Sequence, residues 1–136
     1  MRNQPLLLDR SFPAQIFLAV ILPAGFGFLT GYILGVDQVG YFILQAVGII
    51  GGIGAGFDHV GSDQGFLRGI CGGLLFGVAI LVAHSVFSDQ AKATIPHPHA
   101  ILPIFTTLLG GIFGAIGGGL RARSIAKHAT TDPQPA

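Results

Sequence analysis

The stretch GFLRGICGGLLFG, residues 65–77, has a glycine at every fourth position, namely Gly65, Gly69, Gly73 and Gly77. The same spacing recurs in three other apolar stretches, as Gly27/Gly31/Gly35, Gly48/Gly52/Gly56 and Gly110/Gly114/Gly118. In water, a glycine inside a helix is less favourable than alanine by about 1 kcal/mol, so repeated glycines indicate a compensating gain. In a lipid bilayer, helices associate by close backbone approach, which small residues four positions apart permit. The pattern therefore predicts closely packed transmembrane helices.

The composition agrees with this membrane interpretation. Hydrophobic residues make up 51% of the 136 residues and charged residues only 10%, with a mean hydropathy of +0.71. A soluble domain carries about 25% charged residues. Because about 20 residues cross ~30 Å of hydrocarbon, the chain has room for four spans and for no separate soluble domain. The net charge of +1, with the basic residues at the edges of apolar stretches rather than in one patch, argues against nucleic-acid binding.

We predict an all-α integral membrane fold, with four transmembrane helices in two antiparallel hairpins. One transmembrane domain covers residues 1–124, with spans at about 14–35, 40–57, 65–87 and 100–120, and residues 125–136 form a polar cytoplasmic tail. Pro23 removes one backbone hydrogen bond from the middle of the first span and is expected to kink it. The connection at residues 36–39 is so short that the first two helices must be antiparallel neighbours.

The basic residues predict the orientation of the chain. Six of them flank the ends of spans on one side of the membrane, whereas Lys92 alone falls on the other; the six are Arg2, Arg10, Arg68, Arg121, Arg123 and Lys127. By the positive-inside rule both termini are cytoplasmic. We expect an integral protein of a bacterial-type plasma (inner) membrane.

Polar residues within the predicted spans are few. No carboxylate or lysine lies near a midplane, which argues against a proton-coupled carrier. Gln45 is the best internal candidate for an interhelical hydrogen bond or a pore-lining amide. No nucleophile has a base at a recognisable spacing, and no glycine-rich phosphate loop follows a strand. We therefore expect neither enzymatic activity nor a bound cofactor.

Three histidines lie toward the outer side, at His84, His97 and His99. Together they could bind zinc or copper, or respond to pH near the ordinary imidazole pKa of ~6.5. In an extended His-x-His segment, however, the two rings point opposite ways, and the spacing differs from that of structural zinc sites. The alternative, which we favour, is that the three are interfacial residues.

Charged residues also gather on the cytoplasmic side. Asp58, Asp63 and Arg68 share one short segment, and Arg121 emerges on the same side. An ion pair of Asp58 or Asp63 with one of these arginines would pin the two hairpins together, although an exposed pair contributes only ~0–1 kcal/mol. Alternatively, these side chains surround the inner mouth of a path through the membrane.

The segment Gly69-Ile70-Cys71-Gly72-Gly73-Leu74 resembles the G-x-C-G-G-L stretch of the small four-helix fluoride channels, which have a similar length. Those channels continue with Thr-Thr-Phe-Ser-Thr, whereas here Leu75-Phe76-Gly77-Val78-Ala79 follows. The arginine of their first span and the asparagine of their second have no counterpart here. Their weak charge bias also differs from the bias of this chain. Fluoride conduction is therefore not carried over from the resemblance.

Two functional hypotheses remain. The first is a structural or accessory subunit that packs through its glycine faces with itself or with a larger membrane complex. The second is a homo-oligomeric channel or small-solute transporter, which would need several copies because four short spans enclose no wide path.

The glycine run of the third predicted helix does not form a straight stripe. Each four-residue step drifts ~40° around a helix, so the run from Gly65 to Gly77 spirals. We expect this third helix to touch more than one neighbour and to be the centre of the bundle.

Overall fold

The computed structural model describes residues 6–87, 90–95, 97 and 99–131. Within these ranges the chain has helices and no strands. The elements are η1 (Leu7–Asp9), α1 (Phe12–Ile16), the π-helical turn η2 (Phe17–Ile21), α2 (Leu22–Leu34), α3 (Gln38–Phe57), α4 (Ser62–Phe87) and α5 (Ile101–Thr131). Because α1, η2 and α2 follow one another without a break, they form one span, and four helices are long and apolar enough to cross a membrane. The prediction of an all-α bundle with four such helices is confirmed.

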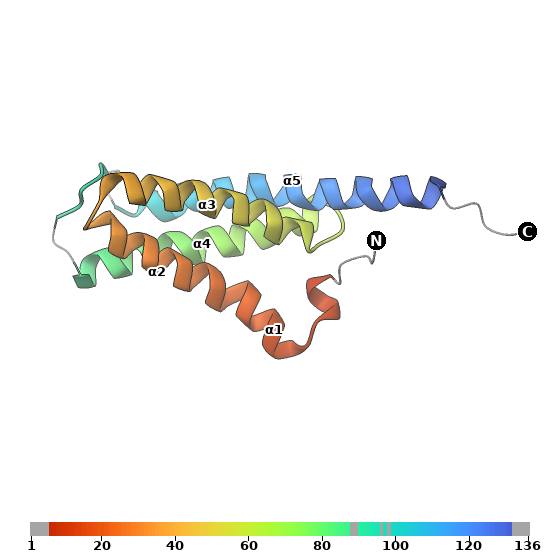
Figure 1. Cartoon of the computed structure of the whole chain (residues 1–136), viewed down its shortest axis with the longest axis horizontal. Coiled ribbons are helices and arrows are strands. Elements are labelled where there is room, and N and C mark those ends of the chain that lie inside the picture. The colour runs from red at the N-terminus through yellow and green to blue at the C-terminus, as the bar shows by residue number, and fades with distance from the viewer. Residues whose placement is uncertain (1–5, 88–89, 96, 98, 132–136) are drawn as a thin grey trace, which may run out of the picture.

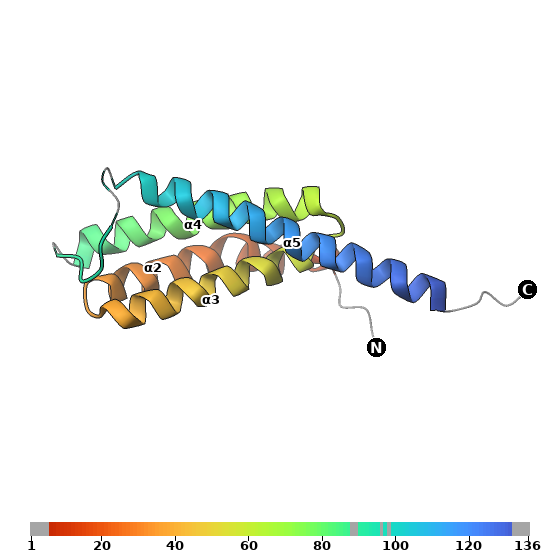
Figure 2. The same cartoon turned by 90° about the horizontal axis from the view of Figure 1, so that it is seen from above.

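The helices run alternately up and down along one long axis, side by side (Figures 1 and 2). One end of the bundle, here called the outer end, holds the turn between α2 and α3 and the segment that leads into α5. The opposite, inner end holds η1 and the loop between α3 and α4. The final turns of α5 continue past the inner end (Figure 1).

The helices α4 and α5 make the most extensive contact in the bundle. A Cβ atom added at Gly69 would meet the carbonyl oxygen of Gly110, and one added at Gly73 would meet that of Thr106. Gly65 and Gly77 also face α5, so all four glycines of the run lie against one neighbour. The glycine run thus lies against α5, while α4 also contacts α2 and α3, so the expectation that this helix touches more than one neighbour is confirmed.

The other close approaches use glycines of α2, α3 and α5. Gly27 and Gly31 of α2 lie against the backbone of Phe76 and Ile80 on α4. Gly56 at the end of α3 lies against Gly114 of α5. The helix α4 therefore contacts α5 through glycines of α4, and it contacts α2 through glycines of α2.

Two boundaries differ from the sequence prediction. The fourth helix does not end near residue 120 but continues through the expected tail to Thr131, and residues 132–136 lie outside the described part. Residues 121–131 contain neither glycine nor proline, so no helix-breaking residue stops α5 there. At the α3–α4 loop, α4 begins at Ser62, directly after Gly61, whose φ of 109° suits glycine.

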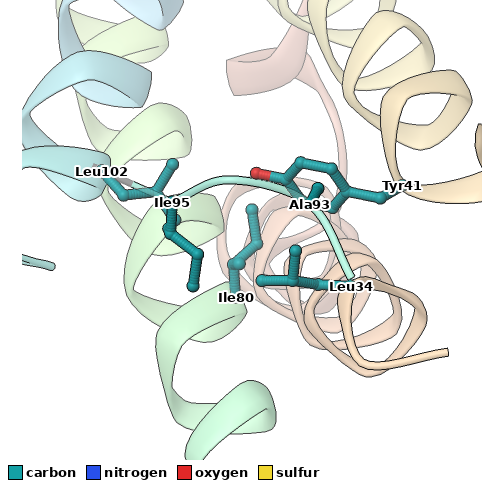
Figure 3. Close-up of a cluster of buried hydrophobic side chains, with 6 residues drawn as sticks. All are labelled: Leu34, Tyr41, Ile80, Ala93, Ile95 and Leu102. Carbon is teal, nitrogen blue, oxygen red and sulfur yellow. The ribbon is translucent and has the colours of Figure 1, made fainter. Parts of the chain in front are cut away.

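Buried apolar side chains close the outer end of the bundle (Figure 3). The cluster consists of Leu34, Tyr41, Ile80, Ala93, Ile95 and Leu102, and we call it the outer cluster. The segment 90–95 reaches across this end and is tied to α2, since the backbone N–H of Lys92 donates to the carbonyl of Leu34 at 2.9 Å. No residue of the outer cluster carries a formal charge.

Candidate functional site

A cavity of about 440 Å³ lies between the four spans. Its walls are apolar except for four polar side chains, those of Gln45, Asp58, Arg68 and Thr106. Along α3 the lining extends from Gln45 to Asp58, which corresponds to about 20 Å at 1.5 Å per residue. The cavity is thus long, narrow and mostly apolar, with charged groups at its inner end.

Glycines of α3 leave this space open. A Cβ added at Gly51 or Gly54 would have no described atom within 4 Å, and one added at Gly52 would only reach the Cβ of Phe113 at 3.8 Å. The lining also includes Leu22 and Val47, which are 50% and 46% exposed. Because these two residues face the surroundings of the bundle, the cavity opens toward the bilayer on the side of α2 and α3.

Polar groups nearer the outer end make hydrogen bonds within the bundle. The amide of Gln45 donates to the Tyr41 hydroxyl at 2.7 Å, and Tyr41 belongs to the outer cluster. The Thr106 hydroxyl lies 2.9 Å from the carbonyl oxygen of Gly73 on α4 and 3.1 Å from that of Pro103 on α5. Gln45, the candidate that the sequence singled out, therefore lines the cavity. Its hydrogen bond to Tyr41 lies within α3 and does not connect two helices.

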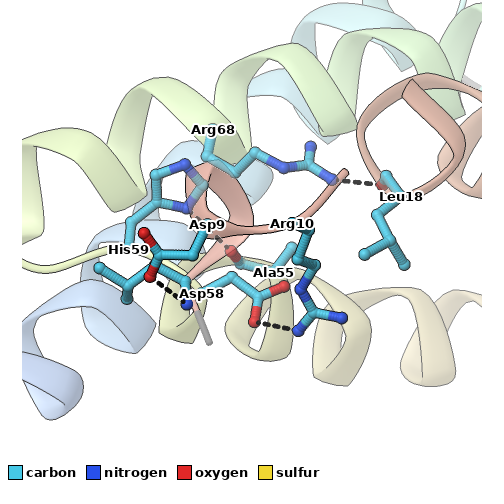
Figure 4. Close-up of polar contacts among 8 residues, drawn as sticks. Asp9, Arg10, Leu18, Ala55, Asp58, His59 and Arg68 are labelled. Atoms are coloured by element: carbon cyan, nitrogen blue, oxygen red, sulfur yellow. Dashed lines mark hydrogen bonds and ion pairs between the residues drawn. The ribbon is translucent and has the colours of Figure 1, made fainter. Parts of the chain in front are cut away.

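At the inner end, Arg68 of α4 donates a hydrogen bond to the carbonyl oxygen of Leu18 at 2.6 Å (Figure 4). The π-helical turn explains why this carbonyl needs a donor. The N–H of Leu22 donates to Phe17, five residues back. In the same register Leu18 would face the nitrogen of Pro23, which carries no hydrogen. The guanidinium of Arg68 replaces the missing N–H group and ties α4 to the first span.

The ion pair at the inner end differs from the pairing predicted. Asp58 pairs with Arg10 across 3.3 Å (Figure 4), a partner that the sequence prediction did not name. The backbone N–H of Leu7 also donates to the Asp58 carbonyl at 3.1 Å, so η1 is attached to the end of α3. The sequence prediction used Arg10 only for orientation, because 48 residues separate it from Asp58.

The other predicted charged residues have separate surroundings. Arg121 is buried, with its guanidinium carbon 5.4 Å from the ring centroid of Phe57. This geometry is that of a cation–π contact between α5 and α3. Asp63 is exposed at the start of α4. The contact of Arg121 with Phe57 thus joins α5 to α3 at this end.

The outer histidines do not assemble into a metal site in the described part of the chain. No group of three or more histidine, cysteine or acidic side chains that could hold a metal ion occurs among the described residues. His84 is half-buried on α4, whereas His97 and His99 are exposed with ring centroids 4.7 Å apart. The expectation that these two rings point opposite ways was wrong, because His97 lies in a bend and His99 in a turn.

The remaining glycine candidates differ in what they face. Gly48 lies beside the ring of Phe76, with 3.2 Å between an added Cβ and the Cζ atom. Gly118 lies against the carbonyl of Gly61, and Gly35 ends α2. Glycines with the same spacing in the sequence thus occupy three kinds of position: close contacts between helices, the wall of the cavity and the end of a helix.

Comparison with known proteins identifies no family for this chain. No protein-family model, curated protein or solved structure matches it. The structure itself supports a small four-span membrane protein, since four long apolar helices form one bundle. Large apolar side chains are exposed on all four helices, as expected for surfaces that lipid covers.

Proposed function

We propose that the protein is a structural or accessory subunit of a larger assembly in a bacterial-type plasma (inner) membrane. The bundle is its anchor, and the inner end of α5 is its point of contact with a partner. The observation that carries this proposal is the length of α5. Its 31 residues span about 46 Å at 1.5 Å per residue, against ~30 Å of hydrocarbon.

The projecting part of α5 has the properties of a contact surface. Residues 125–129 are all exposed, and they include Ile125, Lys127 and His128. Short helical segments are marginally stable in water, and most helices in proteins gain their stability from tertiary packing. A partner that packs on this segment would supply the stabilising contacts, and its basic residues favour an acidic surface on that partner.

The cavity favours this role over a channel formed by one chain. The outer cluster lies between the cavity and the outer end, and its side chains are apolar apart from the Tyr41 hydroxyl. Ions cross membranes along paths lined by polar or charged groups. A homo-oligomeric channel, the second candidate, would therefore place its path between copies of the chain. The role we propose is also non-enzymatic, since the polar lining residues include no nucleophile beside a base.

Purification from native membranes tests the proposal. The intact chain is expected to co-purify with another membrane protein in fixed stoichiometry. A chain that ends at Arg123 should stay in the membrane with unchanged thermal stability but lose that partner. The matched control is a chain that ends at Thr131, which keeps the whole of α5 and should retain the partner.

Two results would contradict the proposal. Isolation of the intact chain as a defined homo-oligomer without other proteins would favour the channel. Equal partner recovery by the chain that ends at Arg123 would exclude the α5 extension as the point of contact.

A further inference from the structure

We propose that the cavity binds one acyl chain of an anionic phospholipid from the inner leaflet, with the lipid phosphate at Arg68. This inference goes beyond the subunit role and does not depend on it. It rests on the shape of the cavity, on its opening toward the bilayer and on the charge at its inner end.

The shape of the cavity suits a single hydrocarbon chain. A volume of about 440 Å³ extends over a length of about 20 Å, so the cavity is elongated in the way that a single hydrocarbon chain is. The length also agrees with the depth of one leaflet, which is about 15 Å, half of the hydrocarbon thickness.

The position of the opening favours a ligand that comes from the membrane. Leu22 and Val47, both half-exposed, lie on the lipid-facing surface of α2 and α3 and line the cavity. The outer cluster separates the cavity from water at the outer end. A lipid chain can therefore move sideways into the cavity without leaving the hydrocarbon layer.

The charge at the inner end suits an anionic headgroup. Arg68 lies six residues into α4, about 9 Å from the start of that helix, and its guanidinium lies beside Gly72, one turn further along α4. The bond to Leu18 holds the guanidinium in place and occupies one of its five N–H donors. The remaining donors form the planar fork that binds phosphate oxygens in pairs.

The acidic groups nearby do not remove this positive charge. Asp58 lines the cavity and its charge also acts on Arg68, but its carboxylate forms its ion pair with Arg10 at 3.3 Å. Asp9 is exposed in η1, where its carboxylate accepts the backbone N–H of Leu6 at 3.1 Å. Arg68 is therefore the group at this end that a lipid phosphate would contact.

Photo-crosslinking in nanodiscs tests the proposal. The probe is phosphatidylglycerol with a photoreactive diazirine in its acyl chain, and labelled peptides are mapped by mass spectrometry. In the wild-type chain the label should fall on cavity-lining residues. Gly51→Leu, which places a side chain in the open space, should lower that labelling about tenfold, the equivalent of ~1.4 kcal/mol. The control is Gly25→Leu, where an added Cβ also has no described atom within 4 Å but which does not line the cavity.

A second pair of variants tests the headgroup contact. The wild-type chain should be labelled more strongly by the phosphatidylglycerol probe than by a phosphatidylcholine probe with the same acyl chain. Arg68→Gln should remove this preference, Arg68→Lys should retain most of it because the charge remains, and the control Lys92→Gln should leave it unchanged. If Arg68→Gln does not fold, two measurements still test the proposal. One is whether Arg68→Lys keeps the preference for the phosphatidylglycerol probe, and the other is the comparison of Gly51→Leu with the wild type.

Two results would overturn the proposal. They are equal labelling of wild type and Gly51→Leu, and equal labelling of the wild type by the two lipids. None of these measurements uses the α5 partner, so they are independent of the test of the subunit role.

Discussion

Gly73 illustrates how single residues set the contacts between helices. An added Cβ would meet the carbonyl oxygen of Thr106, and in return the Thr106 hydroxyl lies at hydrogen-bonding distance, 2.9 Å, from the Gly73 carbonyl. Backbone approach and hydrogen bond thus coincide at one point of the α4–α5 contact. At Gly25 an added Cβ would have no described atom within 4 Å, so the same residue type has no packing role there within this chain.

Substitution of these two glycines by alanine should have opposite effects. Gly73→Ala should lower the free energy of unfolding by about 1–3 kcal/mol, because the helices must move apart. Gly25→Ala should raise it by up to ~1 kcal/mol, because alanine favours the helix and meets no neighbour. Unfolding in mixed micelles, followed by circular dichroism, measures both. Equal stability of the two variants would contradict close packing at Gly73.

The two neighbouring threonines allow a matched test of the interhelical hydrogen bond. Thr106→Val should lower the free energy of unfolding by about 1 kcal/mol, the usual contribution of such a bond in membranes. Thr107→Val should have a smaller effect, since its hydroxyl donates to Pro103 on its own helix at 2.5 Å. The same unfolding measurement compares them, and a larger loss for Thr107→Val would count against the bond to Gly73.

At the scale of the element, the first span is not a regular α-helix. The π-helical turn η2 immediately precedes α2, and Pro23 leaves the carbonyl of Leu18 without its helical donor. Arg68 compensates from another helix. The local irregularity of one element is therefore coupled to a side chain that lies 50 residues away in the sequence.

A double-mutant cycle should detect this coupling. Arg68→Gln alone should lower the free energy of unfolding by about 1.5–3 kcal/mol, as expected for a lost hydrogen bond to a charged group. In the background of Pro23→Ala, the loss of stability caused by Arg68→Gln should be smaller by about 1 kcal/mol. The reason is that the new backbone N–H of residue 23 can donate to the Leu18 carbonyl. Arg123→Gln serves as the control. Strictly additive effects would show that Arg68 does not act as the donor that replaces Pro23.

For the whole molecule, the basic residues lie mostly at one end. Arg10 and Arg121 are at the inner end with η1 and the α3–α4 loop, whereas Lys92 lies in the segment across the outer end. Cytoplasmic segments of membrane proteins carry an excess of lysine and arginine. The arrangement in space thus agrees with a cytoplasmic inner end, which remains a prediction.

Cysteine labelling of intact cells tests this orientation. In a Cys71→Ser background, Lys92→Cys should react with a membrane-impermeant maleimide added from outside. Ser124→Cys should react only after the membrane is permeabilised. The reverse pattern would invert the molecule and would move the proposed lipid site to the outer leaflet.

The sequence predicted the number and the approximate positions of the spans, because hydrocarbon thickness relates directly to the length of an apolar stretch. It missed the end of α5, since the residues after Arg123 looked like a polar tail, although no glycine or proline occurs among them before Pro133. It also did not name Arg10 as a partner of Asp58. That pair forms because η1 is attached to the end of α3 and brings Arg10 to the carboxylate.

The sequence by itself determined that this is an all-α protein with four helices suited to a membrane, because hydropathy and length are properties of local stretches. Only the tertiary structure decided which glycines bring backbones together and which leave a cavity, because that depends on what faces each position. It likewise decided that Arg68 bonds to Leu18, a contact between residues 50 positions apart. Such juxtapositions follow from how the helices cross, which no single stretch of the chain specifies.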